Sequence, residues 1–351
     1  MVPDQAGEPS KAGPAPGSAQ GAWLFAYFRQ RYDSRVEVDK EGHVHNVPLA
    51  DPMRVEQLHL ALSTDGRHWT PLNEGEPVWK HRLRDPFLQR GPDGLWRLVA
   101  TGRGFPRATT AGAEDAGPVC LYATSRDLRT WEGVRSLPLM QGVRDEAGRP
   151  ARNVWAPEWF FDAETQEYVV FWSSSFEDAG WKQSRLWYAR TRDWQAFTPA
   201  KVLFAPGYST IDGTLWKQSD TYFLFHKEEE FAAATGERRA VRVATSHQLE
   251  GPYQVQEGPL NRGQITPTIT EGPSVMPDPL QPGGWLLLYD YCMTNRFGLS
   301  SSADLWRWKI EEEVSFPPDA RHGSEAPLSA VEAERLRASS PVGVGTGVGS
   351  D

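Results

Sequence analysis

The feature that most constrains the fold is a short motif, Ser/Thr-x-Asp-x-x-x-aromatic, that recurs along the 351 residues. Its copies begin at Ser63, Ser125, Thr191, Ser246 and Ser302, 55 to 66 residues apart, and the copy at Ser246 is degraded. Each copy follows a strand candidate, and its Ser and Asp side chains suit a turn in which they bind local backbone. Repeats of this length built from short strands are typical of β-propellers. We therefore expect an all-β fold, a five-bladed β-propeller.

Strand candidates come in pairs within each repeat, separated by clusters of Gly, Pro, Asp and Asn. The absence of a long amphipathic helical pattern excludes doubly wound and barrel α/β folds. One short helix is expected near the C-terminus, where Ser329 and Glu332 have capping-box spacing. The blades are predicted at residues 22–80, 84–137, 153–203, 210–257 and 270–312.

The first repeat lacks the acidic opening segment that the other four carry. We therefore expect the N-terminal segment to share a blade with the end of the chain near Arg321-His322-Gly323, although the sequence leaves open which end supplies the innermost strand. Residues 22–337 are predicted to form one catalytic domain, and residues 1–21 and 338–351, rich in small residues, are predicted to be disordered tails.

Composition and charge exclude some classes of partner and location. A net charge of −9 without clustered Lys and Arg argues against nucleic acid as a partner. No apolar stretch approaches the ~20 residues of a membrane span, and the N-terminus lacks the features of a secretory signal. Cytoplasmic residence is the expectation, and both cysteines, Cys120 and Cys292, are expected to be reduced. The oligomeric state is left open.

Four segments with a carboxylate beside Pro or Gly open the last four repeats. They are Arg84-Asp85-Pro86, Trp155-Ala156-Pro157-Glu158, Ile211-Asp212-Gly213 and Glu271-Gly272-Pro273. In a propeller the innermost strands surround a central channel, so acids at their starts converge at one mouth. Hydrolysis of a glycosidic bond requires a proton donor and either a base that activates water or a carboxylate nucleophile. Asp85, Asp212 and Glu271 are the candidates for this chemistry.

These segments, together with Asp93-Gly94-x-Trp96, Glu167 to Trp172 and Arg321-His322-Gly323, resemble the glycoside hydrolases of family 43 across residues 22–337. The resemblance implies a five-bladed propeller and an inverting arabinofuranosidase, arabinanase or xylosidase. It implies that Asp85 is the general base, Asp212 the modulator of the pKa of the acid, and Glu271 the general acid. Asp212 departs from the family pattern, because Gly213 follows it where the family commonly has proline.

Further residues are candidates for substrate contact: Arg84, Trp155, Glu158, Trp172, Arg296 and His322. Glu158 is equally suited to a structural role, and Arg84 to pairing with a neighbouring acid. His322 corresponds to a family position on the channel axis where some members hold a metal. It is therefore the candidate ligand of a structural calcium ion in the channel, the alternative being a histidine satisfied by hydrogen bonds; no cofactor is required. The run 226–230, His-Lys-Glu-Glu-Glu, is expected to be a solvated loop.

The expected activity is exo removal of terminal α-L-arabinofuranosyl or β-D-xylosyl units from plant-derived oligosaccharides. Two alternatives remain. The first is a retaining hydrolase of the fructosidase type, family 32, whose upstream nucleophile would have to be Asp51, before Pro52. The second is a catalytically inactive propeller that only binds glycans, because a fold does not fix a function.

Overall fold

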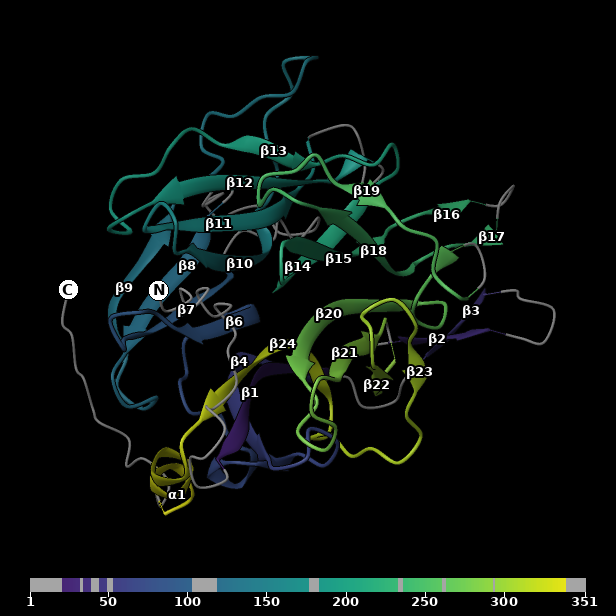
Figure 1. Ribbon diagram of the computed structural model, residues 1–351. Helices are drawn as coiled ribbons and strands as arrows, with labels where there is room; N and C mark the ends of the chain where they lie inside the picture. Colours follow the sequence, from purple (N-terminus) through teal and green to yellow (C-terminus); the bar gives the residue numbers. More distant parts are fainter. Residues whose placement is uncertain are drawn as a thin grey trace, which may run out of the picture.

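A computed structural model describes residues 21–31, 34–38, 44–48, 53–102, 119–176, 183–232, 236–260, 263–292 and 294–338. Nearly all of the two predicted tails, and Asp51 with Pro52, lie outside these residues. The described chain forms five antiparallel four-stranded sheets around a common centre (Figure 1). Each innermost strand contacts the innermost strand of the next sheet, which closes the ring. The predicted five-bladed β-propeller is confirmed.

Four blades are continuous in sequence, and in each the strands follow chain order from the centre outward. The second blade contains β6 (Arg84–Arg90), β7 (Trp96–Thr101), β8 (Cys120–Ser125) and β9 (Glu132–Leu137). The third contains β10 (Trp155–Asp162), β11 (Glu167–Ser174), β12 (Arg185–Thr191) and β13 (Lys201–Phe204). The fourth contains β14 (Thr210–Gln218), β15 (Thr221–Glu228), β18 (Ala240–Ser246) and β19 (Gln254–Val255). The fifth contains β20 (Thr270–Pro277), β21 (Trp285–Tyr291), β22 (Phe297–Ser302) and β23 (Lys309–Ile310).

The first blade joins the two ends of the chain. Its order is β24 (Ala320–Leu328), β1 (Ala22–Arg31), β4 (Met53–Ser63) and β5 (Thr70–Pro71), so the C-terminal strand is the innermost one. This settles the question that the sequence left open. The predicted helix follows as α1 (Ala330–Arg337), and its N-terminus has the capping box between Ser329 and Glu332. Among the described residues, no helix combines the length and apolar character of a membrane span.

Three small elements complete the described chain. A 3-10 turn, η1 (Asn73–Gly75), follows β5. Two hairpins, β2 (Ser34–Val38) with β3 (Val44–Pro48) and β16 (Phe231–Ala232) with β17 (Gly236–Glu237), interrupt the first and fourth blades between their second and third strands. Both lie on the right of Figure 1, beyond the ends of β1 and β15.

The recurring turn motif caps its own backbone in the way the sequence predicts. Ser63 Oγ accepts the N–H of Gly66 at 2.8 Å, and Asp65 Oδ1 accepts the N–H of Arg67 and of His68, each at 2.8 Å. The copies at Ser125, Thr191 and Ser302 repeat this pattern. The residue after the aspartate has a positive φ in each of these four copies, a conformation that the local caps stabilise.

A β-bulge recurs at the start of the inner strands and explains why the four opening segments look alike. In β6, β10, β14 and β20, two residues lie opposite one residue of the second strand, and the first of the two has a positive φ. Those first residues are Asp85, Ala156, Asp212 and Gly272, with φ of 50°, 42°, 53° and 60°. The register of β24 shifts in the same place, next to His322. Bulges re-aim side chains beside active sites, so this repeat presents five equivalent positions at one end of the ring.

Candidate active site

A cavity of about 410 Å³ opens at the bulged end of the inner strands. Six of the residues predicted from the sequence line it: Arg84, Asp85, Trp155, Asp212, Glu271 and His322. The three predicted catalytic acids therefore come together from three different blades. Asp85 and Asp212 occupy the same position of the bulge in their strands, whereas Glu271 stands one residue earlier in its own.

Asp85 is oriented by the neighbouring strand of its own blade. Its Oδ2 accepts a hydrogen bond of 2.6 Å from Thr101 Oγ1 at the end of β7. The same hydroxyl oxygen accepts the backbone N–H of Ala156 from the next blade at 2.9 Å. On the cavity side, His322 Nδ1 lies 3.8 Å from Asp85 Oδ1. Because Thr101 is itself tied to the next blade, the position of Asp85 depends on the packing of two blades.

Asp212 is the most deeply buried of the three acids. Its backbone N–H donates to Ser173 Oγ at 2.9 Å, its Oδ2 accepts the N–H of Gly272 at 3.2 Å, and His322 Nδ1 lies 3.9 Å from the same oxygen. Burial raises the pKa of Asp212 well above its usual value, and the negative charge of Glu271 raises it further. Asp212 is therefore the acid of this pair that holds a proton.

Glu271 has the opposite environment, because two cations contact its carboxylate. Lys227 Nζ lies 2.8 Å from Oε2, and Arg321 Nη2 lies 2.6 Å from Oε1. Burial by itself would raise the pKa of Glu271, but the charges of Lys227 and Arg321 outweigh burial and hold that pKa well below its usual range. Glu271 is therefore ionised in this arrangement.

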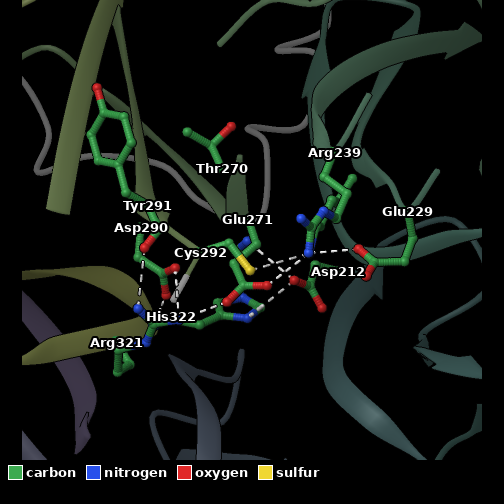
Figure 2. Close-up of polar contacts among 12 residues, drawn as sticks. Asp212, Glu229, Arg239, Thr270, Glu271, Asp290, Tyr291, Cys292, Arg321 and His322 are labelled. Carbon is green, nitrogen blue, oxygen red and sulfur yellow. Dashed lines mark hydrogen bonds and ion pairs between the residues drawn. The ribbon is translucent and has the colours of Figure 1, made fainter. Parts of the chain in front are cut away.

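A second acid, Asp290, lies behind Glu271 on β21. Its Oδ2 accepts the backbone N–H of His322 at 2.9 Å, and its Oδ1 lies 3.1 Å from Arg321 Nη2. Burial raises the pKa of Asp290 to about 7, against the lowering effect of Arg321. Figure 2 shows the contacts of Asp290 with Arg321 and His322 and that of Arg321 with Glu271.

The structure does not bring three of the predicted contact residues to the cavity. Glu158 is buried deeper along β10, where its Oε2 accepts a hydrogen bond of 2.8 Å from Thr214 Oγ1. Trp172 packs in the apolar cluster between the second and third blades. Arg296 is exposed, with its guanidinium 4.8 Å from the centre of the Tyr291 ring. For these three residues the prediction of sugar contact has no support in their positions.

Sequence reasoning missed several residues of the cavity, above all Lys227, Glu229, Asp290 and Arg321. The expectation of a solvated loop over residues 226–230 is wrong for its first part, because β15 continues to Glu228 and the side chains of His226, Lys227 and Glu228 are buried. The signal was present, since this run continues an apolar strand pattern without a Gly or Pro. Arg321 belongs to the motif Arg321-His322-Gly323, but that motif alone indicated no role for its side chain.

The metal prediction for His322 also finds no support. In the described parts of the chain, no three or more His, Cys, Asp or Glu side chains form a group suited to a metal ion. The Nδ1 atom of His322 instead faces the carboxylates of Asp85 and Asp212. The donor set around this imidazole thus consists of the acids that glycoside hydrolysis would use, and it does not fit a dedicated calcium site, which takes six to eight oxygens.

The arrangement supplies carboxyl groups in both charge states around one cavity. Burial and the charge of Glu271 favour the protonated form of Asp212, whereas the charges of Lys227 and Arg321 favour the ionised form of Glu271. Acids whose environments push their pKa values apart are the inventory of general acid and base catalysis.

Comparison with solved structures agrees with the fold. A solved family 43 β-1,3-galactosidase, in complex with galactodeoxynojirimycin, shares the fold with a TM-score of 0.50 at 12% identity, over 83% of this chain and 98% of that chain. An α-L-arabinofuranosidase structure from Lactobacillus brevis superposes with a TM-score of 0.46 at 14% identity, over 67% of this chain and 73% of that one.

Sequence comparison identifies the family more specifically. The chain is 36% identical over 173 residues to an α-L-arabinofuranosidase of Bifidobacterium longum subsp. longum, a match that covers 43% of this chain and 16% of that protein. The chain therefore corresponds to only a small part of this curated relative. The model of a family described as a probable glycosyl hydrolase domain, related to family 43, matches residues 49–334. The chain belongs to this family of probable glycosyl hydrolase domains related to family 43.

Proposed function

We propose that the protein is an inverting, exo-acting glycosidase that removes terminal α-L-arabinofuranosyl or β-D-xylosyl units from plant-derived oligosaccharides. The observation that carries the proposal is the convergence of Asp85, Asp212 and Glu271 on one cavity. The partial relative, an α-L-arabinofuranosidase, supports a pentose substrate. Cytoplasmic residence stays a prediction from the sequence.

In this proposal Glu271 protonates the leaving oxygen, Asp85 activates the attacking water, and Asp212 tunes Glu271. A general acid must carry a proton, whereas Glu271 is ionised while Lys227 and Arg321 contact it. We expect a sugar that enters the cavity to weaken these contacts, so that a proton moves from Asp212 to Glu271. The competing assignment, in which Asp212 itself is the donor, follows from the raised pKa of Asp212.

A panel of 4-nitrophenyl pentosides and hexosides tests the substrate class, and proton NMR of the first product tests the stereochemistry. We expect hydrolysis of an α-L-arabinofuranoside or a β-D-xyloside with inverted anomeric configuration. Retention, with a covalent intermediate trapped by a fluorinated sugar, would support the fructosidase-type alternative instead. Binding of sugars without turnover would support an inactive glycan-binding propeller.

Asp85→Ala tests the base. Because water must be activated whatever the leaving group, kcat should fall by roughly 10²- to 10⁴-fold on both activated and natural substrates. Asp278→Asn is the matched control, since Asp278 is a buried aspartate paired with Arg67 at 2.8 Å after the opposite end of β20. Normal activity of Asp85→Ala with normal folding would remove Asp85 from the mechanism.

A further inference from the structure

One position on the second strand of the blades links each blade to the next. It lies opposite the residue that immediately precedes the bulge, and it is filled by Thr101, Ser173, Lys227 and Asp290 in the second to fifth blades. Thr101, Ser173 and Asp290 each accept a backbone N–H from the bulge of the following inner strand. The shared structural task is therefore to satisfy one buried N–H group, which otherwise costs free energy.

A neutral hydroxyl performs this task in two of the three cases. Ser173 accepts the N–H of Asp212 at 2.9 Å, the same length as the bond from His322 N–H to Asp290. A carboxylate at position 290 is thus not required by the blade contact. Burying a charged group is costly unless the charge serves a partner, so the carboxylate of Asp290 calls for a second reason.

That reason lies in what surrounds Asp290. The Nη2 atom of Arg321 is 3.1 Å from Asp290 Oδ1 and 2.6 Å from Glu271 Oε1, so one guanidinium nitrogen joins the two acids. The Nη1 atom of Arg321 donates to the carbonyl oxygens of Tyr291 and Thr294 at 3.3 and 2.9 Å, which fixes the plane of the group. Figure 2 shows this connection from Asp290 through Arg321 to Glu271.

The carboxylate of Asp290 also orients His322, the residue that follows Arg321. By accepting the N–H of His322, Asp290 sets the backbone from which the imidazole reaches Asp85 and Asp212. We propose that Asp290 is a positioning residue for the glycosidase reaction, which shares Arg321 with Glu271 and so keeps Glu271 able to take up a proton. The proposal rests on the proposed function, in which Glu271 is the proton donor.

The physical effect has a definite sign. The charged groups that face Asp290 are Arg321 and His322 on β24 and Glu271 on β20. A negative Asp290 draws part of the attraction of Arg321 away from Glu271 and repels the charge of Glu271, and both effects raise the pKa of Glu271. Burial is the main cause that raises the pKa of Asp290 to about 7, and the charge of Glu271 adds to it against the attraction of Arg321.

The test compares Asp290→Asn and Asp290→Ser with the wild type. Asparagine keeps an acceptor in place, and serine is the residue that the chain itself uses in the equivalent position 173. Without the charge, the pKa of Glu271 falls, so we expect the basic limb of the kcat/KM profile to move to lower pH by about one unit. At neutral pH kcat should fall while KM changes little. Asp278→Asn, which removes a buried charge after the far end of β20, should leave the profile in place.

A reduced kcat with an unshifted pH profile in both variants would show a merely structural role and overturn the proposal. If one variant fails to fold, the other decides in the same way.

A second measurement needs no substrate. Because the pKa of Asp290 is raised in the folded protein, its contribution to stability is complete below about pH 4, its unfolded value, and is lost as pH rises towards 7. The Tm of the wild type minus that of Asp290→Asn should therefore decrease between pH 4 and pH 7. If the wild type cleaves no sugar of the panel, the proposed function fails. The Tm comparison then still tests the role of Asp290. A Tm difference that does not change with pH would overturn the arrangement in which Asp290 and Glu271 share Arg321.

Discussion

The Nζ atom of Lys227 lies 2.8 Å from Glu271 Oε2 and 2.6 Å from Glu229 Oε2, so one buried ammonium group joins two carboxylates of the cavity. Burial alone would lower the pKa of Lys227, but the anionic groups around it raise that pKa well above its usual value. Lys227 is therefore charged throughout the range in which a glycosidase works, and it favours the ionised form of Glu271.

Removing this cation should make Glu271 easier to protonate. For Lys227→Gln we expect the basic limb of the kcat/KM profile to move to higher pH, the opposite direction from Asp290→Asn. Stability should fall by about 3 kcal/mol, because Glu229 and Glu271 lose a buried partner. Lys227→Arg keeps the charge and should leave the limb near its original pH. If the basic limb of the kcat/KM profile stays in place in Lys227→Gln, Lys227 does not influence the pKa of the proton donor.

The identity of the proton donor can be decided by leaving-group chemistry. A dinitrophenyl glycoside needs no protonation of its leaving group, so Glu271→Ala should retain far more activity on it than on an oligosaccharide. Asp212→Asn should lose activity on both substrates and move the basic limb to lower pH, because an amide cannot become the negative neighbour that opposes ionisation of Glu271 once the proton has moved from Asp212 to Glu271. If Asp212→Asn shows the dependence on leaving group and Glu271→Ala does not, Asp212 is the donor.

The hydroxyl of Thr101 serves both Asp85 and the next blade. In Thr101→Val the isosteric side chain leaves the N–H of Ala156 unpaired, which should cost about 1–3 kcal/mol of stability. Because Asp85 also loses its 2.6 Å hydrogen bond, kcat should fall more than KM rises. Thr101→Ser restores the hydroxyl and is the control for both effects. Equal kcat in the Val and Ser variants would show that this contact does not orient Asp85.

Gly272 is required both by its backbone and by its neighbour. Its φ is +60°, and an added Cβ would lie 2.6 to 2.9 Å from the ring and Cβ of His322. Gly272→Ala should therefore lose about 2–4 kcal/mol of stability and displace His322 from the acids. Gly283→Ala is the matched control, because Gly283 has φ +80° with no atom within 4 Å of the added Cβ. It should therefore lose only the stability that backbone strain costs at positive φ, about 1 kcal/mol. Equal losses in the two variants, measured by denaturant unfolding, would contradict the close packing of His322.

The sequence by itself determined the repeat and the chemistry of its acids. A turn that caps its own backbone needs Ser or Thr and Asp at fixed spacing, and a bulge with positive φ favours Asp, Gly or a neighbouring Pro. Such requirements act within a few residues and therefore produce recognisable patterns in the sequence. For this reason the five blades, the opening segments of the inner strands and the capping box of α1 could all be read without coordinates.

The position of Glu158 away from the cavity has a local cause that the sequence did contain. In β6 the acid precedes the proline of the bulge, whereas in β10 Glu158 follows it. Glu158 therefore lies two residues further along its strand than the cavity-lining position, beside Thr214. Trp172 was misplaced because side chains alternate along a strand: Ser173 faces the next bulge, so its neighbour Trp172 faces the core between the blades.

Only the tertiary structure decided the charge of the site and the closure of the ring. Lys227 and Arg321 reach Glu271 from the two adjacent blades, and Asp290 joins them from the next strand of the same blade through Arg321, an arrangement that no local pattern encodes. Their effect is electrostatic and acts across space within a buried cavity, so the protonation of Asp212 and the ionisation of Glu271 follow from neighbours that are distant in sequence. The innermost place of β24 likewise follows from ring closure, because the first and last strands must pair to complete the first blade.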